Sequence, residues 1–242
     1  MDEQSPSDAP SARELKKEYR EQKQSRIKKF SALRWGLAGI ILVGAGLGLW
    51  WFYGNSNDQQ PGDSDVLGLT ENEWIHGNSE APVILVEYAD FQCPACGVYY
   101  AWVKNLEQDF PDSLAVVFRH FPLSSIHFNA LPAARAAESA GKQDKFWEMH
   151  DVIFENQQEW STSSDAESVF RDYADRLGLN VEQFLTDYNS KSFDAKIKNN
   201  LNSGEALGVS GTPTFFLNGA KINNPRSYDE FRKMIEQISI KQ

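Results

Sequence analysis

Residues 83–96 read VILVEYADFQCPAC and combine an apolar run with a pair of cysteines. The first seven of these residues are apolar apart from Glu87, and a short continuous apolar run is typical of a buried strand. Cys93 and Cys96 follow it and are the only cysteines among the 242 residues. Two cysteines separated by two residues, between a strand and the start of a helix, predict a pair that cycles between dithiol and disulfide.

Other uses of a cysteine pair fit this chain less well. A structural zinc site needs four ligands, but the chain has no second C-x-x-C and no H-x-x-x-H, and its four histidines are scattered. A purely structural disulfide at this spacing would close a tiny loop and so remove little entropy from the unfolded chain. We therefore expect no metal and no cofactor.

Charge is distributed unevenly along the chain. The formal net charge is −10, and a nucleic-acid-binding protein would instead need a basic surface. Residues 1–34 carry a net charge of +3, so the remainder carries −13. A basic head and an acidic body indicate that the two parts lie in different environments.

Residues 35–53 read WGLAGIILVGAGLGLWWFY and contain no charged side chain. At a rise of about 1.5 Å per residue, a helix of this length just spans a hydrocarbon core of about 30 Å. The aromatic residues at its two ends are placed like interfacial anchors. A cleaved signal peptide fits less well, because both the apolar run and the arm before it are long. The sequence predicts a transmembrane anchor whose basic arm, residues 1–34, is cytoplasmic.

The remainder of the chain is predicted to form one α/β domain outside the cytoplasm. Residues 54–65 read as a flexible polar linker and residues 66–242 as the domain. Its expected order is β-α-β, an all-helical insertion at about residues 122–207, then β-β-α. Apolar spacing and turn signals place strands at 82–88, 114–118, 213–217 and 220–222, and helices at 98–110, within 128–206 and after Ser227.

Three short signals refine these boundaries. Asn218-Gly219 is typical of a two-residue hairpin turn. Asn180 precedes Gln183 at the spacing that opens a helix, and Ser164 precedes Glu167 as in a capping box. We therefore expect helices to begin just after Asn180 and just after Ser164.

The cysteines are predicted to have different roles. Cys93 should lie at a helix N-terminus, where free N–H groups and the helix dipole stabilise a thiolate. Cys96 lies one turn further on, faces inward and should resolve a mixed disulfide formed on Cys93. Glu87 allows two interpretations from its spacing alone. It is either a buried acid that exchanges protons with Cys96 or a strand-end acid that points at solvent.

Four stretches together resemble the DsbA-like thiol:disulfide oxidoreductases, which are thioredoxin folds with a helical insertion. These stretches are VEYADFQCPAC at 86–96, FRHFPL at 118–123, KFWEMHD at 145–151 and GVSGTPTF at 208–215. The resemblance runs from about residue 82 to residue 238. It implies a cis peptide bond before Pro213, with Thr212 and Pro213 binding the substrate backbone, and it favours the buried-acid role for Glu87.

The resemblance also implies a function and its partners. Together with the predicted anchor, it suggests a single-pass protein of the cell membrane that introduces disulfides into exported proteins. A quinone-linked membrane thiol oxidase, DsbB-like or VKOR-like, would reoxidise it. The strongest oxidants of the family have Pro-His between the cysteines, where this chain has Pro-Ala, so a reductase or isomerase remains an alternative. A tethered binding module or chaperone without redox turnover is a third hypothesis.

Overall fold

The computed structural model describes residue 69 and residues 73–239. The basic arm, the transmembrane anchor and the linker predicted for residues 1–65 lie outside this range. Within the described residues, no helix combines the length and the apolar character needed to cross a membrane.

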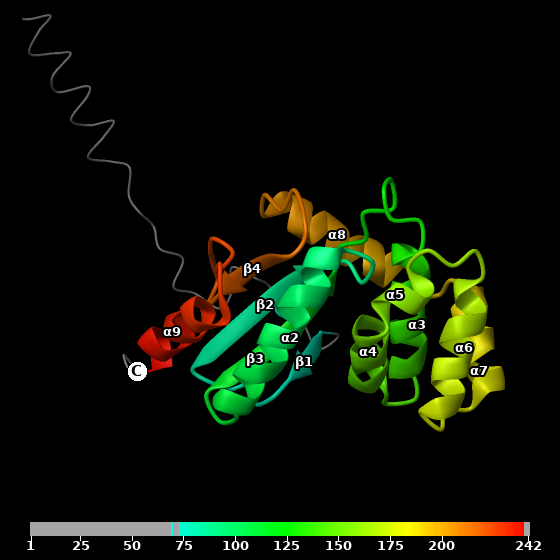
Figure 1. Ribbon diagram of the computed structural model, residues 1–242, viewed down its shortest axis with the longest axis horizontal. Coiled ribbons are helices and arrows are strands. Elements are labelled where there is room, and N and C mark those ends of the chain that lie inside the picture. Colours follow the sequence, from blue (N-terminus) through cyan, green and yellow to red (C-terminus); the bar gives the residue numbers. More distant parts are fainter. Residues whose placement is uncertain (1–68, 70–72, 240–242) are drawn as a thin grey trace, which may run out of the picture. The chain divides into compact units, whose positions relative to one another are not determined.

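The apolar run before the cysteines forms β2 (Val83–Ala89), an inner strand of a five-stranded sheet within the described residues (Figure 1). Helix α2 (Pro94–Asp109) connects β2 to β3 (Leu114–His120), and these two strands pair in parallel. On its other side β2 pairs antiparallel with β4 (Thr214–Leu217), which turns back into β5 (Ala220–Lys221). The β-α-β and β-β units expected from the sequence are therefore present in one sheet.

The hairpin between β4 and β5 turns at Asn218 and Gly219, as predicted. Both residues have positive φ, 45° and 85°, which is the conformation that favours Asn-Gly in two-residue hairpins. The Asn218 side chain also accepts a bond from the Ile84 amide (2.7 Å) and donates to the Pro82 carbonyl (2.9 Å). The turn thereby also fixes the start of β2.

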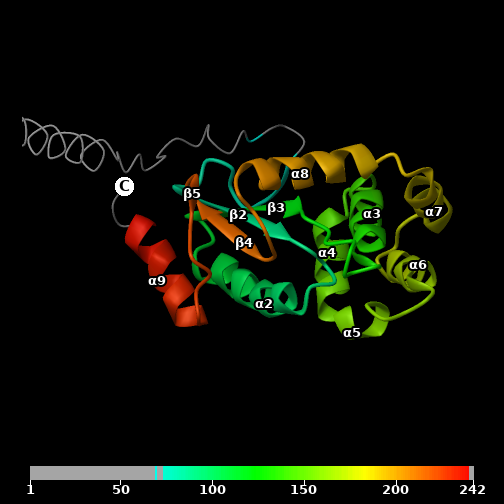
Figure 2. The ribbon, with the colours of Figure 1, turned by 90° about the horizontal axis from the view of Figure 1, so that it is seen from above.

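Helices cover both faces of the sheet (Figure 2). Helix α2 and the last helix, α9 (Tyr228–Ser239), pack on one face around Leu85, Leu106 and Phe231. Helix α8 (Asp194–Ala206) covers the other face, where Val86 and Phe216 are buried. Because both faces are covered, β2 and β3 read as nearly continuous apolar runs instead of alternating ones.

Apart from α8, the helices of the insertion between β3 and β4 form a packed layer beside the sheet (Figure 1). An aromatic and alanine-rich core joins these helices to α2. Asn180 caps its helix by accepting from the Gln183 amide (3.0 Å), as predicted. The prediction for Ser164 is wrong by one residue, because the Asp165 carboxylate caps instead, accepting from Ser168 N. The helices of the insertion are α3 (Ala130–Gly141), α4 (Phe146–Glu155), α5 (Gln157–Trp160), α6 (Ala166–Arg176), α7 (Val181–Ser190) and α8.

One strand was not predicted. Strand β1 (Trp74–His76) pairs antiparallel with β3 at the edge of the sheet. Its three residues lack the run of alternating or apolar side chains that identifies a strand in sequence. Pairing with β3 and the stacking of Trp74 on Phe146 (ring centroids 4.2 Å apart) hold it in place.

Candidate active site

Cys93 is the N-cap residue of α2, as the sequence predicts. Its backbone is extended (φ −69°, ψ 121°), and Pro94 occupies the first turn of the helix. Proline is tolerated there because its missing N–H would have no partner within the helix. The Cys93 amide donates to the Asp90 carbonyl (3.0 Å), and the Cys93 carbonyl accepts from the Gly97 amide (3.2 Å). Both cysteines are free thiols, so the structure represents the dithiol form.

The two sulfurs have opposite electrostatic environments. The pKa of Cys93 falls to about 5, chiefly because the Cys96 thiol donates a hydrogen bond to its thiolate and because backbone amides at the start of α2 do the same, against the opposing effect of burial. Burial and the neighbouring Cys93 raise the pKa of Cys96 well above its ordinary value. At neutral pH Cys93 is therefore the thiolate, and Cys96 keeps its proton.

The loop before β4 lies against Cys93, although the two are far apart in sequence. The Thr212–Pro213 peptide bond is cis, as the resemblance implies, and the Thr212 carbonyl lies 3.4 Å from the Cys93 sulfur. Within the described residues the Thr212 hydroxyl is buried and has no hydrogen-bond partner while Cys93 is a thiol. Once Cys93 ionises, this hydroxyl can donate to the thiolate, which lowers the pKa of Cys93. The structure thus brings together Thr212, Pro213 and Cys93.

Glu87 points into the interior and not at solvent. Its exposed fraction is 3%, and its Oε1 atom has no hydrogen-bond partner among the described residues. Burial, together with the negative charge of Glu107, raises the pKa of Glu87 to about 8. Glu87 in turn contributes to the raised pKa of Cys96. Of the two interpretations open from spacing, the structure therefore agrees with the buried acid.

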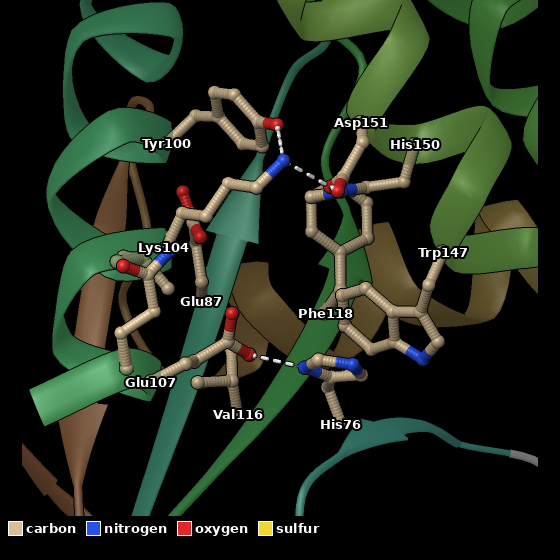
Figure 3. Close-up of a pocket in the computed structure, with 12 residues that line it drawn as sticks. His76, Glu87, Tyr100, Lys104, Glu107, Val116, Phe118, Trp147, His150 and Asp151 are labelled. Atoms are coloured by element: carbon tan, nitrogen blue, oxygen red, sulfur yellow. Dashed lines mark hydrogen bonds and ion pairs between the residues drawn. The ribbon is translucent and has the colours of Figure 1, made fainter. Parts of the chain in front are cut away.

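A cavity of about 250 Å³ extends from Glu87 between α2, β3 and α4 (Figure 3). Its floor is Glu87, and its mouth carries a hydrogen bond between His76 and Glu107 (2.7 Å) and an ion pair between Lys104 and Asp151 (2.8 Å). A polar cavity of this size has room for several water molecules. It therefore provides a route along which a proton can pass between Glu87 and the bulk.

Residues at the mouth of this cavity escaped sequence reasoning. His76 lies on the unpredicted strand β1, and Asp151 lies on α4, far along the chain from Lys104 on α2. The only signal available in sequence was the spacing of Tyr100 and Lys104, whose side chains meet at 2.8 Å one helical turn apart. The pairs across the cavity depend on tertiary placement.

Two other histidines have structural partners. His120 is buried and bonds to Glu138 (3.0 Å), which also accepts from Trp74 and Lys196. His150 is buried next to Asp151 (3.0 Å), and burial lowers its pKa. These contacts link β1, β3, α3, α4 and α8 around the insertion, away from the sulfur atoms.

Comparisons with known proteins agree with this geometry. A family model described as thioredoxin matches residues 69–237. Among solved structures, oxidised BdbD from Bacillus subtilis matches with a TM-score of 0.62 and 23% identity, covering 69% of this chain and 93% of that one. Wolbachia pipientis alpha-DsbA1 matches with a TM-score of 0.66, 22% identity and coverages of 74% and 96%. A thioredoxin-like oxidoreductase from Silicibacter pomeroyi matches with a TM-score of 0.60, 27% identity and coverages of 72% and 95%.

Curated relatives carry a different name. The Na(+)/H(+) antiporter NhaA 3 of Salinispora tropica is 39% identical over 155 residues, which are 64% of this chain and 23% of the antiporter. The NhaA of Herminiimonas arsenicoxydans is 36% identical over 159 residues, 66% of this chain and 24% of the antiporter. The chain thus spans about a quarter of the length of the curated relatives it matches.

Proposed function

This chain belongs to the thioredoxin family, and we propose that it is a thiol:disulfide oxidoreductase that acts through Cys93 and Cys96. One observation carries the proposal: Cys93 caps the N-terminus of α2 beside the cis Thr212–Pro213 bond, while Cys96 is fully buried behind it. This arrangement lowers the pKa of Cys93 to about 5 and raises that of Cys96 well above its ordinary value. Disulfide exchange needs such a pair, because one sulfur must attack or leave as a thiolate and the other must hold its proton until it is used.

In the oxidising direction the cycle begins with a Cys93–Cys96 disulfide. A client thiolate attacks the Cys93 sulfur, a client–Cys93 disulfide forms, and Cys96 leaves with the electron pair of the broken bond. A second client thiolate attacks the client sulfur of this mixed disulfide, and Cys93 leaves as a thiolate. The client gains a disulfide. The enzyme accepts two electrons from the client and ends in the dithiol form. The low pKa of Cys93 favours this direction, because a stabilised thiolate stabilises the dithiol form relative to the disulfide, and it also lets Cys93 leave faster.

Glu87 supplies the proton that Cys96 needs as it leaves. With a pKa of about 8, Glu87 is mostly protonated at neutral pH and lies close enough to Cys96 to affect its pKa. After donating, it regains a proton from solvent through the cavity shown in Figure 3. Thr212 and Pro213, next to Cys93, bind the client backbone.

The proposed setting is a cell membrane, with residues 35–53 as the anchor and the catalytic domain outside the cytoplasm. The clients are exported proteins with reduced cysteines. A DsbB-like or VKOR-like membrane thiol oxidase returns the enzyme to the disulfide form. The uncharged apolar run and the basic arm before it support this setting.

The alternative is a reductase or isomerase that a membrane donor keeps in the dithiol form. The exposed Ala95 favours it, because alanine cannot supply the hydrogen bond or charge with which a histidine would stabilise the Cys93 thiolate. Trapping the thiols in intact cells distinguishes the two. A mostly disulfide form supports the oxidase, and a mostly dithiol form supports the reductase or isomerase.

The enzymatic proposal is tested on a reduced peptide that contains two cysteines. The disulfide form of the protein should oxidise it, with loss of two hydrogen atoms by mass spectrometry, and Cys93→Ser should abolish the reaction. If Cys93→Ser supports client folding as well as the unaltered protein does, the chain is a tethered binding module or chaperone, and the redox proposal is wrong.

A further inference from the structure

Three amide side chains bind the segment that ends in Cys93 to the helical insertion. They belong to Gln92, Asn129 and Gln157, and we call them the amide clamp. The Gln92 side chain accepts from the backbone N–H of Asn129 (2.7 Å) and donates to the backbone carbonyl of Ser161 (2.7 Å). Asn129 donates to the carbonyl groups of Trp160 (3.0 Å) and Ser163 (2.9 Å). The clamp thus ties residues 91–93 to the chain around α5.

Gln157 is the member of the clamp that reaches Cys93 itself. Its Nε2 atom donates to the Phe91 carbonyl (2.7 Å) and to the Cys93 carbonyl (2.9 Å). Helix α5, where Gln157 lies, passes beside the N-terminal end of α2 (Figure 2). The Cys93 carbonyl also accepts the first hydrogen bond of α2, from Gly97. Two donors therefore fix the carbonyl of the residue whose sulfur reacts.

Gly97 makes room for this contact. A Cβ atom at position 97 would lie 3.1 Å from the Gln157 Oε1 atom and 3.5 Å from its Nε2 and Cδ atoms. Glycine is otherwise unfavourable inside a helix, where alanine is preferred. The glycine in the first turn of α2 and the glutamine on α5 thus form a matched pair, one giving the space that the other occupies.

We propose that Gln157 is a positioning residue for Cys93, holding the carbonyl groups of Phe91 and Cys93 so that the first amides of α2 stay aimed at the Cys93 sulfur. The proposal rests on the proposed thiol:disulfide exchange. Backbone amides of Cys96 and Ala95 stabilise the thiolate only while Cys93 keeps its N-cap geometry. The helical insertion therefore contributes to the reactivity of Cys93 without touching the sulfur.

The test is Gln157→Ala in the full chain, with Gln143→Ala as the matched control. Gln143 is also half-buried, and its amide bridges two segments in the same way, donating to the Asn180 carbonyl (3.2 Å) and accepting from the Asn180 amide (2.8 Å), but away from the cysteines. The readout is the pKa of Cys93, from the pH dependence of thiolate absorbance, and the reduction potential against glutathione.

We expect Gln157→Ala to raise the pKa of Cys93 and lower the potential, and Gln143→Ala to change neither. A rise of about one unit would lower the thiolate fraction at pH 5 about fivefold, and a tenfold change in the thiolate equilibrium corresponds to about 30 mV. Equal pKa values and potentials in Gln157→Ala and the unaltered protein would overturn the proposal. So would equal shifts in both variants, which would reflect a general loosening of the fold.

Gly97→Ala provides a second test that leaves Gln157 in place. In the unaltered background the new methyl group would lie 3.1 Å from the Gln157 Oε1 atom, so the amide must shift by a few tenths of an ångström. This shift should weaken its bonds to the Phe91 and Cys93 carbonyl groups and raise the pKa of Cys93. In the Gln157→Ala background there is no amide to displace, so Gly97→Ala should change nothing further. Additive effects in the two backgrounds would contradict the proposal. The pKa can be measured even if the protein fails to oxidise a client, so failure of the proposed function is distinguishable from failure of the positioning role.

Discussion

Replacing Glu87 by glutamine should stabilise the protein in a pH-dependent way. The pKa of Glu87 is about 8 in the folded protein and has its ordinary value of 4.5 when unfolding exposes the side chain. Between these values the folded state binds one more proton than the unfolded state, so the free energy of unfolding falls by about 1.4 kcal/mol per pH unit. Glutamine does not titrate, and Glu87→Gln removes this slope. The stability gap between the variant and the unaltered protein should therefore widen by about 2.5 kcal/mol between pH 5 and pH 7.

Urea unfolding of the dithiol form at both pH values measures this gap, and Glu138→Gln is the control. Glu138 is as buried as Glu87, with exposed fractions of 2% and 3%. Burial acts to raise the pKa of Glu138, but the hydrogen bond and charge of His120 and the charge of Lys196 outweigh it, and the net pKa is lowered. The ionised form of Glu138 therefore stabilises the fold at pH values above the pKa that Glu138 has in the unfolded chain. Glu138→Gln should lower the free energy of unfolding at pH 7. If the difference in free energy of unfolding between Glu87→Gln and the unaltered protein is the same at pH 5 and pH 7, the pKa of Glu87 is not raised in the folded protein. Glu87 then has no part in the proton transfer.

Three further outcomes follow from the sulfur environments. Alkylation of the dithiol form should modify Cys93 with a rate that falls only below about pH 5, while Cys96 stays unmodified at neutral pH; a midpoint near pH 9 would contradict the assigned thiolate. Cys96→Ser should accumulate client proteins on Cys93 as mixed disulfides in non-reducing gels, and their absence would remove the resolving role from Cys96. Ala95→His should lower the pKa of Cys93 and raise the reduction potential, since an imidazolium beside the thiolate stabilises the dithiol form, and an unchanged potential would mean that position 95 does not set it.

The strands and helices with strong local signals could be predicted from the sequence. The apolar runs of β2 and β3 are buried on both faces, so each is recognisable without knowledge of its neighbours. The hairpin at Asn218 and Gly219 depends on the conformational preferences of two residues alone. Strand β1 escaped prediction because it is a strand only by virtue of its pairing with β3. The cap of α6 lies one residue beyond the predicted Ser164, because Ser164 and Asp165 are both good N-cap residues and lie side by side.

The candidate site divides in the same way. The place of Cys93 at the start of α2 follows from a local pattern, a strand followed by C-x-x-C with proline in the first turn. The burial of Glu87 was undecided from spacing, because it depends on what α2 and α4 place around the end of β2. Gln157 gave no signal at all, since a glutamine on a short helix looks like an ordinary polar residue until Cys93 is found beside it.

The reduction potential of this protein should lie between those of thioredoxin and DsbA. Thioredoxin combines a cysteine pKa of about 7 with about −270 mV, and DsbA combines about 3.5 with about −120 mV. The pKa of Cys93, about 5, is two units below that of thioredoxin, and about 30 mV per unit predicts about −210 mV, whereas interpolation between the two proteins predicts about −185 mV. The methyl side chain of Ala95 contributes nothing to this shift, which comes from the Cys96 thiol, the Thr212 hydroxyl and the backbone amides of Cys96 and Ala95. Equilibration with glutathione measures the potential. A value at or below about −270 mV would mean that the low pKa of Cys93 does not destabilise the disulfide. The proposal of an oxidase would then be wrong, and the reductase alternative would be supported.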